Sequence, residues 1–78
     1  MAHSRRMDGF VLEYSRIDPN APGGQRRERY IAVAETADRA FAAAGGHWGV
    51  RQVVIESGPA VLQRAREMGI ADNQARTL

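Results

Sequence analysis

The sequence predicts a small α+β domain with the element order ββαβα, folded as a three-stranded mixed sheet with two helices on one face. Strand-like alternation covers residues 10–17, and helix-like repeats of apolar residues cover 37–44 and 59–68, with turn formers between the segments. A chain of 78 residues can build only one core. We therefore expect a single domain over residues 9–78, after a leader over residues 1–8 that shows no periodicity.

Residues 10–17 and 26–35 form the expected hairpin. The first strand places Phe10, Leu12 and Tyr14 on one face and residues of more mixed character on the other. The turn sequence DPNAPGG follows, rich in residues that favour turns. The second strand ends in YIAVA, which is apolar on both faces and indicates a central strand, or one whose second face a partner covers.

The next two elements are a helix and a third strand. Thr36 is a suitable N-cap for a helix over residues 37–44, and two glycines follow that helix. The apolar run within residues 50–56 predicts a short strand inside the sheet. A connection of about thirteen residues is near the minimum for a parallel crossover, so we expect the second and third strands to pair in parallel.

The second helix is expected over residues 59–68. The sequence Ser-Gly-Pro at 57–59 supplies a cap residue and a proline at the first helical position. Gly69 and Ile70 fit the end of a Schellman motif, and residues 71–78 add at most a frayed turn. With both helices on one face, the other sheet face is a candidate surface for homodimer formation or partner binding.

Composition excludes several functional classes. Without cysteine there are no disulfides, no thiolate nucleophile and no cysteine-ligated metal, and we expect a cytoplasmic protein. No apolar run is long enough for a membrane span, so we expect no membrane partner. Eleven arginines, no lysine and nine acidic residues give a formal net charge of +2. Any electrostatic function must therefore depend on where the charges lie.

We predict no catalytic residue, no metal site, no cofactor and no enzymatic activity. The two histidines are His3, in the leader, and His47, which has no serine or carboxylate at a catalytic spacing. The sequence GGHWG around His47 follows a helix and precedes a strand, whereas phosphate-binding loops lead from a strand into a helix. The Ser-Gly-Pro turn has the right order for an anion site, but its residues are those of a helix cap.

Arginines gather on the hairpin, with Glu28 as the acidic residue inside the cluster. Their guanidinium groups suit the phosphates of nucleic acid or the carboxylates of a protein, although a charged hairpin tip can also serve only to prevent aggregation. Tyr30 is expected to stack on Tyr14 across the hairpin, and Trp48 either anchors a partner or closes the core. The predicted partner-binding residues are Arg16, Arg26, Arg27, Arg29, Tyr30 and Trp48.

The order RYIAVA, TADRAFAAA and VVI, at residues 29–34, 36–44 and 53–55, resembles the organisation of small phage-encoded anti-CRISPR proteins. The resemblance covers residues 10–57 and concerns layout alone, so it transfers no functional residue. It implies a non-enzymatic inhibitor in the host cytoplasm that binds a CRISPR effector complex and blocks access to target DNA. The layout is also similar to that of some antitoxins.

We therefore predict a non-enzymatic module that binds a protein partner, in its narrower form an anti-CRISPR inhibitor. The alternatives are a small nucleic-acid-binding protein that uses the arginine-rich hairpin, and an antitoxin-type protein.

Overall fold

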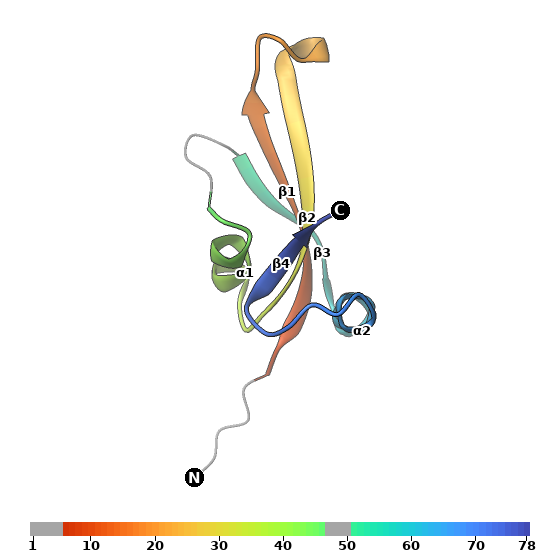
Figure 1. Ribbon diagram of the computed structural model, residues 1–78. Coiled ribbons are helices and arrows are strands. Elements are labelled where there is room, and N and C mark those ends of the chain that lie inside the picture. Colours follow the sequence, from red (N-terminus) through yellow and green to blue (C-terminus); the bar gives the residue numbers. More distant parts are fainter. Residues whose placement is uncertain (1–5, 47–50) are drawn as a thin grey trace.

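A computed structural model describes residues 6–46 and 51–78, which contain an antiparallel sheet and two α-helices (Figure 1). The elements are β1 (Asp8–Ile17), β2 (Gln25–Ala34), α1 (Ala37–Ala43), β3 (Arg51–Gly58), α2 (Pro59–Glu67) and β4 (Gln74–Thr77). The sheet has the order β3-β1-β2-β4, and every pair in it is antiparallel. The α+β class is confirmed, whereas the three-stranded mixed sheet is wrong.

The hairpin of β1 and β2 is the longest feature of the fold. Its strands pair without interruption from Asp8 opposite Ala34 to Ile17 opposite Gln25, and a short 3-10 turn closes it. β3 pairs with β1 only as far as Ser15, and β4 pairs with β2 only as far as Tyr30. The end of the hairpin therefore projects beyond its neighbours, and the longest dimension of the molecule is 52 Å (Figure 1).

The position of β3 corrects the prediction of a parallel strand inside the sheet. β2 and β3 do run in the same direction, since both are antiparallel to β1, but β1 lies between them. β1 occupies one edge of β2 and β4 occupies the other, so β3 lies on the far side of β1. Its apolar residues are consequently exposed: Val53 by 39%, Val54 by 38% and Ile55 by 47%.

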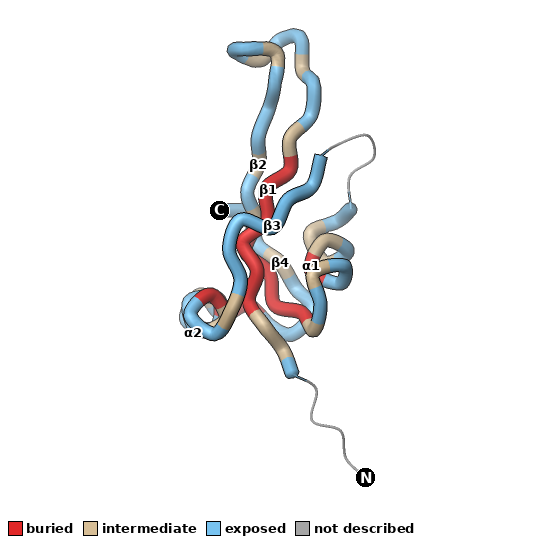
Figure 2. Tube along the Cα trace, turned by 180° about the vertical axis from the view of Figure 1, so that it is seen from behind, coloured by how far each residue is buried: buried red, intermediate tan, exposed pale blue. Residues whose placement is uncertain are grey.

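The two helices lie on opposite faces of the sheet, not on one face as predicted (Figure 1). α1 packs against the face of Phe10, Leu12 and Tyr14, and α2 packs against the face of Val11 and Ile31. Figure 2 shows the buried residues concentrated along the part of β1 and β2 between the helices. Both faces of β1 and β2 are apolar because a helix of the same chain covers each of them, and this part of the sheet has no open face.

The predicted start of α1 and end of α2 are confirmed, whereas the predicted cap at the start of α2 is corrected. The Thr36 Oγ accepts a hydrogen bond from the Arg39 N–H at 3.2 Å, which confirms the predicted cap of α1. The Ile70 N–H donates to the Ala65 carbonyl at 3.1 Å and the Ile70 side chain is buried, which confirms the Schellman end of α2. The N-cap of α2, however, is Gly58 at φ 124°, and no side chain caps that end.

The two ends of the described chain belong to the fold. β1 begins at Asp8, and Met7 packs against the α2 side of the core, so the fold reaches into the expected leader. The expected frayed end is instead the edge strand β4. It starts after Asn73, whose N–H donates to the Val33 carbonyl at 2.8 Å, and Ala75 packs on the α1 side of the core.

Candidate partner-binding surface

The sheet face that carries α2 continues past the helix toward the hairpin end, where no helix covers it. Opposed residues of antiparallel strands share a face. The register therefore groups Glu13 with Arg29 and Val53, and the next rung groups Ser15 with Arg27 and Arg51. We call this surface the arginine face; its residues are Glu13, Ser15, Ile17, Gln25, Arg27, Arg29, Arg51 and Val53.

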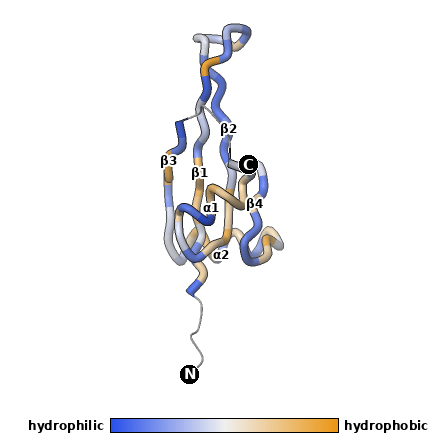
Figure 3. Tube along the Cα trace, turned by 90° about the vertical axis from the view of Figure 1, so that its left-hand side faces the viewer, coloured by the Kyte–Doolittle hydropathy of each residue, from blue (hydrophilic) through white to orange (hydrophobic). Residues whose placement is uncertain are grey.

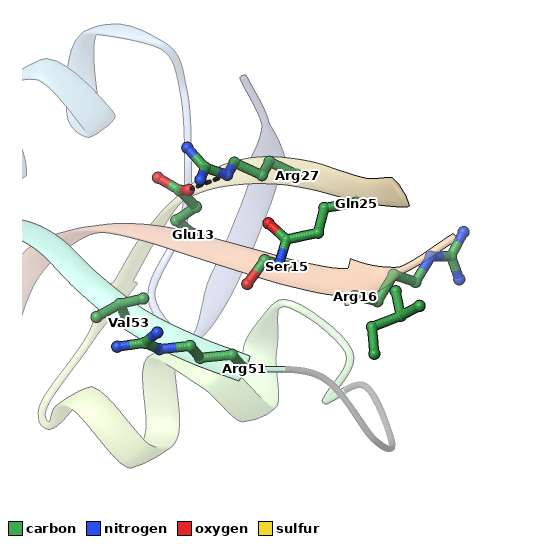
Figure 4. A pocket seen from close by; sticks show the side chains of 8 residues that line it. Glu13, Ser15, Arg16, Gln25, Arg27, Arg51 and Val53 are labelled. Atoms are coloured by element: carbon green, nitrogen blue, oxygen red, sulfur yellow. Dashed lines mark ion pairs between the residues drawn. The ribbon is translucent and has the colours of Figure 1, made fainter. Parts of the chain in front are cut away.

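An open hollow of about 430 Å³ lies on this face (Figure 4). β1, β2 and β3 each contribute to it, and Figure 4 shows Arg27 and Arg51 on opposite sides of Ser15. The lining residues are Glu13, Ser15, Arg16, Ile17, Gln25, Arg27, Arg51 and Val53. The hollow is therefore walled by guanidinium and apolar groups above a polar floor.

Glu13 organises the arginine face. Only 9% of it is exposed, and its Oε2 lies 3.2 Å from both Nε and Nη2 of Arg29, while its Oε1 lies 3.7 Å from Nε of Arg27. The two arginine side chains remain 58% and 68% exposed. One carboxylate thus orients two guanidinium groups whose remaining N–H donors face solvent, where they can bind carboxylates or phosphates.

The remaining hairpin arginines lie on the opposite face. Arg16 and Arg26 are opposed in the register, and Arg26 Nε lies 3.7 Å from the Asp18 carboxylate. The predicted cluster is therefore divided: Arg27 and Arg29 belong to the arginine face, whereas Arg16 and Arg26 project from its reverse. A single flat partner cannot engage all four in the same way.

Tyr30 also lies on the reverse face, where it joins the hairpin to the core. Its ring meets Tyr14 edge to face at a centroid distance of 5.4 Å, as the sequence predicted, and its hydroxyl donates to Glu28 at 3.1 Å. Burial, together with that hydrogen bond, raises the pKa of Tyr30. A contact between Tyr30 and a partner stays a prediction, because the interactions of this side chain in the structure are with other residues of the same chain, Glu28 on the hairpin and Thr77 on β4 among them.

The excess charge of the chain is located at this end of the molecule. Residues 13–29 and the adjoining Arg51 contain five arginines and three carboxylates, an excess of two positive charges. This equals the whole formal net charge of +2, so the rest of the chain is balanced. Figure 3 shows hydrophilic residues along most of the projecting hairpin.

Glu13 and Arg51 were absent from the predicted site. Alternation along β1 places Glu13 on the same face as Val11, but only the pairing with β2 brings it beneath the arginines. Arg51 joins them because β3 pairs with β1, which no local pattern in the sequence indicates. The remaining predicted contact, Trp48, lies outside the described residues, as do His3 and His47.

Two further searches concern other kinds of site. Among residues 6–46 and 51–78, no three acidic or histidine side chains gather in a way that could hold a metal ion. In the same part of the chain, neither helix has the length and apolar character needed to cross a membrane.

Comparison with family models, curated proteins and solved structures gave no match for this chain.

Proposed function

We propose that this chain is a non-catalytic binding module that docks its arginine face on an acidic surface of a partner protein. The observation that carries the proposal is the pair of guanidinium groups oriented by Glu13 beside an open hollow, at the end of the molecule where the excess charge lies. Prior orientation of these side chains lowers the entropy that binding must remove.

The composition of the surface favours a protein partner over nucleic acid. Ile17 is 83% exposed and Val53 39%, so exposed apolar groups lie on the same face as the arginines. Arginine mixed with apolar side chains is typical of protein interfaces, where the apolar area is desolvated on binding. The central carboxylate of Glu13 would repel a phosphate chain laid across the same face, and it offsets half of the charge of Arg27 and Arg29.

Site-specific photo-cross-linking in the cells that make this chain tests the proposal. A photoreactive phenylalanine analogue replaces Ile17, on the arginine face, and in a second variant it replaces Gln63, an exposed position on α2. We expect a discrete adduct from position 17 that protease removes and nuclease does not. Equal adducts from both positions, a nuclease-sensitive adduct, or no adduct from position 17 would contradict the proposal.

A matched pair of charge variants gives the control. Arg26→Ala with Arg27→Ala removes two positive charges from the hairpin while the contact between Arg29 and Glu13 remains. Arg64→Ala with Arg66→Ala removes two charges from α2, far from the hairpin end; both arginines make exposed ion pairs, and Arg66 also donates a hydrogen bond to the Ile70 carbonyl at 3.3 Å. The adduct should be lost in the first double variant and kept in the second.

In the narrower form of the proposal the partner is a CRISPR effector complex, and the bound chain blocks its access to target DNA. The resemblance of the sequence layout over residues 10–57 to that of small anti-CRISPR proteins supports this form. Expression of the chain in cells with an active CRISPR system should restore transformation by a targeted plasmid. The hairpin double variant should not restore it, whereas the α2 double variant should. Failure of both the chain and the α2 variant would reject the narrower form alone.

A further inference from the structure

β3 is an edge strand whose central residues are apolar and exposed, although it carries a β-bulge and a charged residue on either side of them. It contains no lysine or proline, and Val53, Val54 and Ile55 are all more than one third exposed. No described strand pairs with its outer side, and the sheet contacts of α1 are mainly with β2, with fewer to β4 and β1. An edge of this kind offers its backbone N–H and C=O groups to another strand.

A β-bulge gives this edge an unusual charge arrangement. Arg51 and Glu56 are five residues apart, so a regular strand would place them on opposite faces. The register against β1 shifts at Ile55, however, and Arg51 pairs with Ser15 while Glu56 pairs with Val11. Because Ser15 and Val11 share a face of β1, Arg51 and Glu56 share the corresponding face of β3. The edge thus carries a cation at one end and an anion at the other, on one side of the sheet.

We propose that a second copy of this chain pairs with β3 in antiparallel fashion, about a two-fold axis at Val53. This register places Val53 opposite its own copy and Arg51 opposite Ile55, directly beside Glu56 of the other chain. A two-fold axis makes the arrangement occur twice, so both ends of the edge become charge-complementary. Glu56, which already contacts Arg64 at 3.0 Å, then lies between two arginines.

The dimer joins two antiparallel sheets into one. A two-fold axis perpendicular to the sheet keeps equivalent faces on the same side, so both arginine faces point in one direction. The dimer would therefore present two copies of the surface described above, although the pairing itself does not depend on the proposed function.

Sedimentation of the unmodified chain at micromolar and higher concentration is the first test. The expected result is a species of twice the chain mass that dissociates on dilution. A single-chain mass over the whole range would overturn the proposal. This measurement needs no variant, and hence no assumption about how a variant folds.

Cysteine cross-linking tests the register, since the chain has no cysteine of its own. Directly opposed residues of antiparallel strands have Cα atoms about 4.5 to 5.5 Å apart, which suits a disulfide. Val53→Cys should form a disulfide-linked dimer under mild oxidation much faster than Gln74→Cys, on the edge strand β4. Equal rates, or faster cross-linking at position 74, would overturn the assignment to β3.

Exchange of the charges tests the complementarity. Arg51→Glu alone and Glu56→Arg alone each place like charges together twice, and each should weaken self-association about tenfold. An equimolar mixture of the two variants should form a heterodimer close to the unmodified affinity, because each interface end regains one cation and one anion. A mixture no tighter than the separate variants would contradict the proposed pairing.

Discussion

Tyr14 connects three parts of the structure through one side chain. Its hydroxyl donates to the Phe41 carbonyl at 3.0 Å, and its ring meets Tyr30 and Phe41 edge to face, at centroid distances of 5.4 and 5.8 Å. It is only 3% exposed. The hydrogen bond satisfies a buried hydroxyl and one carbonyl near the end of α1, so Tyr14 positions the helix relative to the hairpin.

Replacing this hydroxyl should destabilise the fold moderately. Tyr14→Phe keeps the ring contacts but leaves the Phe41 carbonyl without that donor. We expect the free energy of unfolding to fall by about 0.5 to 1.5 kcal/mol, measured by urea denaturation. Tyr30→Phe, which removes a hydrogen bond to Glu28 nearer the surface, is the control and should cost less. An equal or larger loss for Tyr30→Phe would show that the hydroxyl of Tyr14 does not hold α1.

The two tyrosines should also make the fold sensitive to alkaline pH. Burial raises the pKa of Tyr14, with a smaller contribution from Tyr30, and burial is likewise the main cause of the raised pKa of Tyr30. Above the ordinary tyrosine pKa of about 10, the unfolded chain therefore loses protons that the folded chain still holds. Stability is fully present below that pH and falls as the pH rises through it.

The measurement is the urea midpoint between about pH 9 and pH 11. The chain has no lysine or cysteine, and arginine keeps its proton in this range, so the tyrosines are the side chains that titrate there. We expect a midpoint that falls with pH, and a shallower fall in Tyr14→Phe. A midpoint that stays constant or rises would contradict the direction of both pKa changes.

At the scale of elements, the contact between β1 and α2 depends on Gly9. A Cβ atom at Gly9 would lie 2.2 Å from the Leu62 amide nitrogen and 2.4 Å from the Val61 carbonyl carbon. These are backbone atoms of α2, which cannot turn aside as a side chain could. The absence of a side chain at Gly9 therefore sets how closely this helix approaches the sheet.

Gly9→Ala should consequently separate α2 from β1. We expect the free energy of unfolding to fall by at least about 1 to 3 kcal/mol, because the added Cβ must push the whole of α2 away from β1. Gly24→Ala in the hairpin turn is the control. Its Cβ meets nothing within 4 Å, so only the strain of a positive φ of 74° remains. A Gly9→Ala protein as stable as the unmodified chain would show that α2 does not pack this closely.

The elements that the sequence predicted are those with local signals. The alternation of β1, the Thr36 cap and the Gly69-Ile70 helix end each depend on residues close together in the chain, and each is confirmed. β4 was missed because its sequence QART has no strand-like pattern; it forms by pairing with an edge of β2 that nothing else occupies.

The relative placement of elements required information that no short segment carries. A run such as VVI is apolar enough for a central strand, yet β3 is an edge strand because β1 is the one described strand that pairs with it. The same holds for the candidate surface. Alternation alone separates Arg27 from Arg26, but only the pairing of three strands brings Arg51 and Glu13 together with Arg27.

At the scale of the whole molecule, the end that projects furthest is also the end that carries the excess positive charge. The hairpin extends one end of a body whose other dimensions are 23 and 16 Å, and that end carries the whole positive excess. A partner approaching along the field of the molecule therefore meets the arginine face first. The field is weak, however, because an excess of two charges is small compared with that of proteins that bind nucleic acid by charge alone.

Salt dependence separates a protein partner from nucleic acid. Binding to duplex DNA through phosphates releases counterions, with a slope of log affinity against log salt of about −0.9 for each phosphate neutralised. Three such contacts would lose more than about tenfold in affinity between 50 and 200 mM salt. Contacts that are desolvated in a protein interface are screened much less.

We expect no appreciable affinity for nucleic acid at the higher salt, because Glu13 and Glu28 offset the arginines on the two faces of the hairpin. The measurement is titration of labelled duplex DNA, single-stranded DNA and RNA with the chain at both salt concentrations. Weak binding at low salt, lost equally in the hairpin and α2 double variants, would reflect the general charge of the protein. Micromolar or tighter binding at high salt, abolished by Arg26→Ala with Arg27→Ala and retained by Arg64→Ala with Arg66→Ala, would instead identify the hairpin as a nucleic-acid-binding element and contradict the proposed protein-binding function.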